Sequence, residues 1–259
     1  MRFVHALVAG LAAFPCSDTA EQLKTLKAAY KAKDSAAAIQ VFDGLIQSFE
    51  SMPPKEQEDA VKVVEQAFGS RSDEGDDVTR LFIAASATLA NLGPSGEKAL
   101  VRVIALKPVR KKPAVLATAV EGLGRQANPA MIDVLLPFLR IEQALGPNSP
   151  VVVGAANALA RYRAADPKLR KKVVGELVAV YSELDSKYQA DRAKPEPSDE
   201  ISAAFQSFET PLREALRALS GAQHQKLEDW KKWWSTAKDA DWSAPGASAD
   251  PDKKKAGGT

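Results

Sequence analysis

The chain has 259 residues, of which 45% are hydrophobic and 26% charged, and its formal net charge is +2. The apolar share is large enough for a packed core and excludes a chain that is disordered throughout. The nearly balanced charge gives no overall attraction to nucleic acid or to anionic lipid. A single cysteine, Cys16, excludes an intrachain disulfide and a cluster of thiolate metal ligands.

The first residues have the pattern of a secretory signal peptide. Arg2 supplies a positive charge, residues 3–14 are mostly apolar, and small residues follow. We therefore expect a signal peptide over residues 1–20, cut near Ala13 or Ala20, and a mature protein that is secreted or periplasmic. An amphipathic first helix that stays attached is the alternative.

The same region bears on membrane attachment. The apolar run is shorter than the roughly 20 residues that span a bilayer, and no other segment approaches that length, so no transmembrane segment is predicted. A lipoprotein anchored through Cys16 is a second alternative. It is disfavoured because Phe14 and Pro15 precede this cysteine, where a small residue is normally found.

Apolar residues recur at helical spacing beyond Thr19, and none of this region alternates with the period of two that strands require. Asp34 can cap a second helix, and the Pro53-Pro54 pair can open a third. We predict that residues 21–70 form helices that cap a larger array. The polar, acidic residues 69–77 that follow indicate a loop, since they lack the spacing of a calcium-binding EF-hand.

An imperfect internal repeat is the strongest signal in the chain. Each of four predicted helices ends in a leucine that has apolar residues three and seven positions before it, which places the three side chains on one helix face. The leucines at 92, 123 and 159 lie 31 and 36 residues apart, the length of one helical hairpin. The four ends are Leu89-Ala90-Asn91-Leu92-Gly93, Val120-Glu121-Gly122-Leu123-Gly124, Ala156-Asn157-Ala158-Leu159-Ala160 and Leu216-Arg217-Ala218-Leu219-Ser220.

A second apolar helix follows each of these ends, and Asn128-Pro129 and Asp166-Pro167 form cap-plus-proline starts for two of them. This pattern resembles the HEAT-repeat (armadillo-like) family over residues 77–236. It is also similar to a bacterial subgroup whose last hairpin closes with a tryptophan-rich helix, here Trp230-Lys231-Lys232-Trp233-Trp234. The resemblance implies an all-α fold, a right-handed α-α superhelix of stacked helical hairpins, and no active site.

Two segments depart from the array. Residues 185–197 are charged, contain two prolines and are predicted to form an inserted loop, with an extension of the preceding helix as the alternative. Residues 237–259 contain one large apolar residue, Trp242, and are predicted to be a disordered tail because they can bury little surface.

The residues do not suggest catalysis. The chain has two histidines, His5 in the predicted signal peptide and His224, which we expect to begin the last helix. This inventory favours neither a metal site nor a nucleophile–histidine site, and no phosphate-binding glycine motif occurs. We therefore predict a protein that is not an enzyme and needs no cofactor. Trp230, Trp233 and Trp234 share one helix face and are expected to cap the array, with an exposed aromatic ligand platform as the alternative.

Binding is the function that remains. In the family that the chain resembles, the wall formed by the second helices commonly receives a partner, and mixed charge on that wall favours a protein over a polyanion. The candidate contact residues are Lys98, Arg102, Asp133, Arg140, Lys172 and Glu176. The alternative is a cytosolic protein that binds nucleic acid through a basic edge over residues 161–172. That edge comprises Arg161, Arg163, Lys168, Arg170 and Lys171 together with Lys172.

Overall fold

The computed structural model describes residues 19–69, 75–140 and 149–242. These residues form helices and turns and contain no β-strand, so the predicted all-α class is confirmed. None of the helices in the described ranges is long and apolar enough to cross a membrane.

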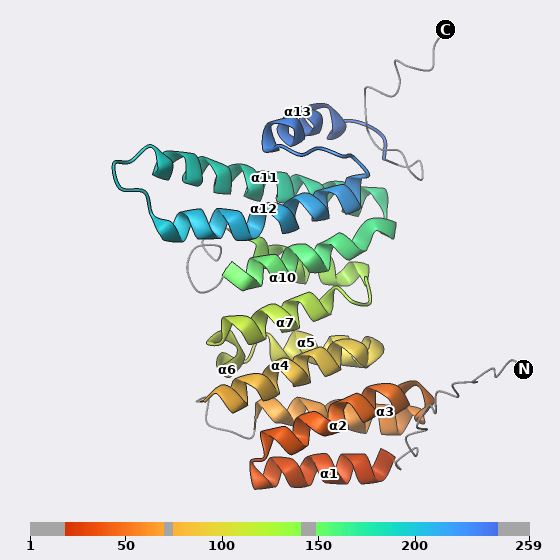
Figure 1. The fold of residues 1–259 in the computed structure, drawn as a ribbon. Helices are drawn as coiled ribbons and strands as arrows, with labels where there is room; N and C mark the ends of the chain where they lie inside the picture. The colour runs from red at the N-terminus through yellow and green to blue at the C-terminus, as the bar shows by residue number, and fades with distance from the viewer. Residues whose placement is uncertain (1–18, 70–74, 141–148, 243–259) are drawn as a thin grey trace, which may run out of the picture.

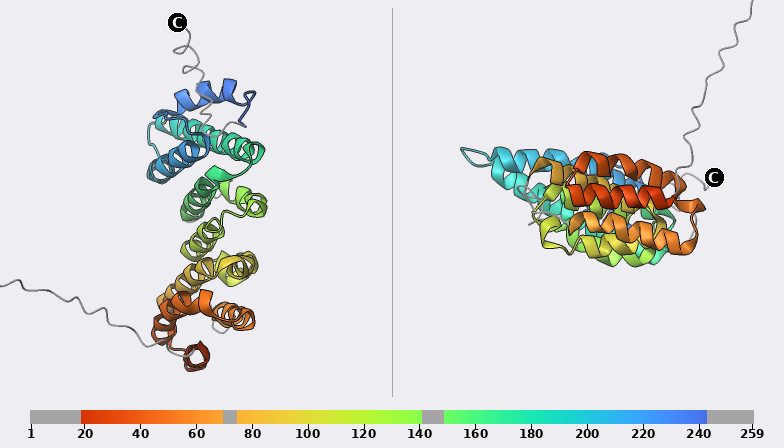
Figure 2. Two further views of the ribbon diagram at one scale, coloured as in Figure 1. Left: turned by 90° about the vertical axis from the view of Figure 1, so that its right-hand side faces the viewer. Right: turned by 90° about the horizontal axis from the view of Figure 1, so that it is seen from below.

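The helices are stacked from α1 at one end to α13 at the other, with α12 lying between α10 and α11 (Figure 1). The view along the helices separates them into two columns (Figure 2, left). We call α2, α4, α7, α10 and α12 the first helices, and α3, α5, α8, α11 and α13 the second helices. Each first helix packs against the next one along the chain. The short helix α1 (Thr19–Ala32) covers α2 and α3 at the N-terminal end.

The bounds of the columns are as follows. The first helices are α2 (Ser35–Ser48), α4 (Asp76–Asn91), α7 (Pro113–Leu123), α10 (Ser149–Ala160) and α12 (Asp199–Ser220). The second helices are α3 (Pro54–Glu65), α5 (Gly93–Val103), α8 (Ile132–Leu135), α11 (Pro167–Arg192) and α13 (Leu227–Ala237). Shorter elements are α6 (Lys107–Arg110) and the 3-10 turns η1 (Phe49–Ser51), η2 (Gln66–Phe68), η3 (Pro129–Met131), η4 (Leu136–Leu139) and η6 (Arg161–Ala164).

The helix starts follow from local sequence. Asp34, Asn128 and Asp166 each accept a hydrogen bond from a backbone N–H of the following turn. Such caps satisfy donors that a helix start would otherwise leave unpaired. Pro113 and Pro167 occupy the first position of α7 and α11, where the missing N–H costs nothing.

The repeat pattern predicts the core correctly. The four terminal leucines, Leu92, Leu123, Leu159 and Leu219, are all fully buried. The apolar residues three and seven positions before each of them are buried too. One stripe on each first helix therefore faces the second helices across a continuous core.

The structure differs from the prediction for the inserted segment, residues 185–197. The predicted loop over residues 185–197 is wrong for most of its length, because α11 continues to Arg192 and α12 begins at Asp199; the alternative, an extension of the preceding helix, describes residues 185–192 correctly. Tyr188 stacks on Phe205 with ring centroids 4.3 Å apart, and Arg192 lies over the Tyr188 ring. These contacts continue the apolar packing of the hairpin, so the two long helices extend beyond the rest of the column (Figure 1).

The predicted tail also needs correction at its start. Ala237 ends α13, and Trp242 is buried with its indole N–H donating to the Ala237 carbonyl at 2.9 Å. Residues 243–259 lie outside the described residues, as do the predicted signal peptide up to residue 18 and Cys16. His224 does not begin the last helix, since α13 starts three residues later at Leu227.

Candidate functional site

The six predicted contact residues are all exposed on the second helices or their ends. Lys98 and Arg102 lie on α5, Asp133 on α8, Arg140 directly after η4, and Lys172 and Glu176 on α11. The second column therefore carries all six, as the pattern predicted, although half of them already have partners within the chain.

Charged pairs join successive second helices. Arg102 donates through Nε and Nη2 to both carboxylate oxygens of Glu65 on α3, at 2.8 and 2.6 Å. Hydrogen bonding to Glu65 raises the pKa of Arg102. The Lys172 Nζ lies 2.6 Å from Asp133 Oδ1, so the structure brings these two candidates together. Three of the six candidates are thus occupied in holding neighbouring second helices together.

A polar pair of a different kind lies between these two bridges. Asn128 donates to Glu97 Oε2 at 2.7 Å, although Glu97 is almost fully buried. Burial raises the pKa of Tyr162, and the charge of Glu97 raises it further. The sequence does not reveal this buried carboxylate, because a single glutamate on a predicted helix is ordinarily exposed.

The predicted basic edge is largely committed to the C-terminal segment. Arg170 donates to the carbonyls of Leu219 and Trp242 at 3.1 and 3.2 Å, and its guanidinium lies 5.8 Å from the centroid of the Trp242 ring. Lys171 donates to the Ala240 carbonyl at 2.7 Å. These cations therefore fasten residues 237–242 against the start of α11.

The remaining residues of the basic edge, Arg161, Arg163 and Lys168, differ in their surroundings. Arg161 lies 3.6 Å from Glu121 on α7, while Arg163 and Lys168 are exposed. A protein that tracks a polyanion needs a continuous stripe of cations. Because Arg161, Arg170 and Lys171 already have partners within the chain, the edge does not offer a polyanion such a stripe of free cations.

The tryptophans of α13 face the interior. Trp230 and Trp233 are buried with ring centroids 5.5 Å apart, and Trp234 is partly buried. Trp242 lies 5.9 Å from Trp233 between centroids, which extends the aromatic cluster into the segment after α13. This arrangement agrees with the capping interpretation.

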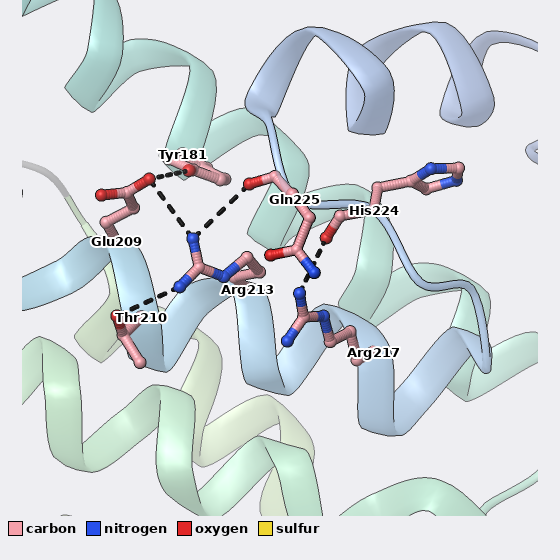
Figure 3. Close-up of polar contacts among 7 residues, drawn as sticks. All are labelled: Tyr181, Glu209, Thr210, Arg213, Arg217, His224 and Gln225. Carbon is pink, nitrogen blue, oxygen red and sulfur yellow. Dashed lines mark hydrogen bonds and ion pairs between the residues drawn. The ribbon is translucent and has the colours of Figure 1, made fainter.

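A second cluster of polar residues lies between α12 and the connection to α13 (Figure 3). Arg213 bonds Glu209 Oε1, Thr210 Oγ1 and the Gln225 carbonyl, at 3.4, 3.4 and 3.5 Å. Tyr181 donates to the same Glu209 oxygen at 3.3 Å, and burial, followed by Glu209, raises the pKa of Tyr181.

The same connection is held one turn further along α12. Arg217 donates to the His224 carbonyl at 3.2 Å (Figure 3), and the His224 ring packs edge-on against Trp230. Although this cluster contains histidine, tyrosine, glutamate and arginine, its bonds run to one another and to the backbone. It therefore positions α13.

A groove of about 670 Å³ lies on the first helices. Its lining comes from α4, α7, α10 and α12, so it crosses four successive layers. Small side chains make up its floor, namely Ala87, Ala90, Ala117, Gly122 and Gly154.

Close contact between helices explains this floor. A Cβ on Gly154 would lie 2.7 Å from the Ala117 carbonyl oxygen, and a Cβ on Gly122 would lie 2.9 Å from the Ala90 Cβ. Both distances are too short for ordinary packing, so α7 approaches α4 and α10 this closely only because these positions are glycine. This part of the groove is consequently formed largely by backbone and methyl groups.

Three ionisable residues border the groove, and they are Glu121, Arg125 and Arg161. Arg125 is exposed and makes no ion pair with any residue that the structure describes. Arg161 is the one predicted surface residue that lines the groove. The alanines and glycines of the lining carry no sequence signal of their own, because periodicity alone does not distinguish them from other residues of a helix surface.

Within residues 19–69, 75–140 and 149–242, no group of three or more histidine, cysteine, aspartate or glutamate side chains is placed to hold a metal ion. Comparison with known proteins adds no relative: no protein-family model, no curated protein and no solved structure matches the chain.

Proposed function

We propose that the chain is a non-catalytic helical-repeat scaffold that binds a protein partner. In this proposal the layered hairpins form a right-handed, HEAT-like superhelix, in keeping with the resemblance carried by the repeated leucine ends. The groove on the first helices is the observation that carries the proposal, because a groove across several layers offers one partner a continuous surface.

Because of the groove, we expect the partner to contact the first helices and not the second helices. The second helices engage Arg102, Asp133 and Lys172 in internal pairs, which a partner would have to break. The first helices present a hollow with an apolar floor and a charged rim. A partner gains more by covering apolar surface than by replacing ion pairs that already exist.

Site-specific photo-crosslinking tests the proposal. A benzophenone amino acid is placed at Thr118 in the groove and, as a matched control, at Glu176 on the second-helix face, in full-length chains expressed in the native host. We expect one reproducible protein adduct at Thr118 and none at Glu176. Adducts at Glu176 alone, or the same mixture of proteins at both positions, would refute the assignment of the binding face.

We further propose that the protein works outside the cytoplasm, which the signal-like pattern of residues 1–20 supports. Because α1 begins at Thr19, a cut after Ala13 leaves this helix whole, whereas a cut after Ala20 removes its first two residues. Mass spectrometry after cell fractionation, which identifies the first residue of the mature chain, tests this point. An intact Met1 in the cytosolic fraction would contradict it.

The nucleic-acid alternative loses support from the contacts of Arg170 and Lys171. Both side chains donate to backbone carbonyls of the C-terminal segment, and a phosphate would have to displace those bonds. The interaction with a protein is therefore the function that we retain.

A further inference from the structure

The hydrogen-bonding groups around the groove differ in what they can still offer to a ligand. Asn91, Thr118 and Ser207 line it from three helices, and each donates to a carbonyl of its own helix, at 2.7, 3.0 and 2.8 Å. These bonds use the hydroxyl protons of Thr118 and Ser207 and one of the two amide protons of Asn91, so the side chains retain more oxygen acceptors than donors. A ligand that bonds these oxygens must bring donors of its own, such as backbone N–H groups.

An extended peptide has such donors and an α-helix does not. The backbone N–H groups of a helix are paired internally, whereas those of an extended segment are free to bond a neighbour. The alanines and glycines of the lining add apolar surface that apolar side chains of such a segment can cover.

The rim fixes the charge of the ligand. Two arginines and one glutamate border the groove, so its ionisable side chains sum to a net positive charge. Glu121 offsets Arg161 at 3.6 Å, which leaves Arg125 to attract an anion. Complementary charge steers association and selects among partners.

We infer that the groove binds an extended, acidic segment of the partner protein, with apolar residues between its carboxylates. This inference rests on the proposed function and names the chemistry of the partner at the same groove. A carboxylate of the segment pairs with Arg125, and the backbone N–H groups bond the oxygens of Asn91, Thr118 and Ser207.

Fluorescence anisotropy with the full chain tests the inference. The probe is a labelled peptide of Glu-Ala-Pro repeats, which proline keeps out of the helical conformation. Two further peptides serve for comparison, one with lysine in place of glutamate and one of glutamate and alanine alone, which can form a helix. We expect the Glu-Ala-Pro peptide to bind most tightly, and its affinity to fall as salt is added.

Charge-reversal variants then test where on the protein the peptide binds. Arg125→Glu is expected to weaken binding about tenfold or more, because it turns an attraction into a repulsion. Arg140→Glu makes the same change on the second-helix face and is expected to leave binding unchanged. Circular dichroism of both variants checks that they are folded.

The inference is overturned if the Glu-Ala-Pro peptide does not bind, or if it binds Arg125→Glu as tightly as the parent chain. Preference for the peptide that can form a helix also overturns it. If the Glu-Ala-Pro peptide fails these tests but a partner still cross-links at Thr118, the inference about the ligand is wrong and the scaffold proposal is retained. A peptide that binds as expected, without any adduct at Thr118, supports the chemistry of the groove and counts against the scaffold role.

Discussion

The first and second helices differ both in length and in the way they contact their neighbours. First helices range from 11 residues in α7 to 22 in α12, and α4, α7 and α10 meet through glycine and alanine. Second helices range from 4 residues in α8 to 26 in α11, and long charged side chains join several of them. The close contacts tolerate little change, whereas long side chains can bridge variable gaps. The constraint of the repeat therefore lies in the first column.

The largest expected effect is in the core that both columns share. Leu123→Ala should lower the free energy of unfolding by about 2–5 kcal/mol, because Leu123 on α7 is fully buried. Urea unfolding followed by circular dichroism measures it. Leu106→Ala, at a leucine that is 37% exposed, should change stability by less than about 0.5 kcal/mol. Equal effects at the two positions would mean that the repeat register is wrong.

The close contact of the first column should produce the next largest effect. Gly154→Leu should cost about 1–3 kcal/mol, since its side chain must push α10 away from the Ala117 carbonyl. The control is Gly69→Leu, where an added Cβ meets its nearest neighbour, the Gln66 carbonyl oxygen, only at 4.0 Å. Thermal unfolding of both variants makes the comparison, and a neutral Gly154→Leu would remove the proposed constraint.

The pairs of the second column should contribute less. A double-mutant cycle of Arg102→Ala and Glu65→Ala should give a coupling free energy below about 1 kcal/mol, because Arg102 is largely exposed. The coupling should shrink further as salt is added. Several kcal/mol of coupling would show that the second helices are held as tightly as the first.

The smallest effect depends on pH and concerns the turn that joins α11 to α12. Hydrogen bonds from Lys194 and the Ser198 N–H lower the pKa of Asp191. A lowered folded-state pKa gives stability that is present above the unfolded value of about 4 and is lost as the pH falls through the folded value. Asp191→Asn should therefore be less stable than the parent at neutral pH, and the difference should close in acid. A difference that is constant from pH 7 to pH 2 would contradict this role for Asp191.

The sequence predicts the first column well because its repeated leucines mark both the helix ends and the buried face. It predicts less where the contacts depend on the backbone. Arg170 and Lys171 bond main-chain carbonyls, which every residue possesses, so no sequence pattern identifies those partners. The continuation of α11 to Arg192 and the burial of Trp242 also depend on neighbours distant in the chain, Phe205 and Arg170. The groove was missed for the same reason, since its floor exists only where Gly122 and Gly154 bring helices together.

Matched tryptophan substitutions on the two columns test the central claim that the first helices form the binding face. Ala87→Trp fills the groove from an exposed position on α4, and Lys98→Trp places the same side chain on the exposed face of α5. The affinity of each variant for the partner cross-linked at Thr118 is measured by isothermal titration calorimetry. We expect Ala87→Trp to weaken binding about tenfold or more, with Lys98→Trp unchanged, as for a side chain that occupies the contact area. Loss of binding in Lys98→Trp with full binding in Ala87→Trp would place the partner on the second helices and contradict the claim.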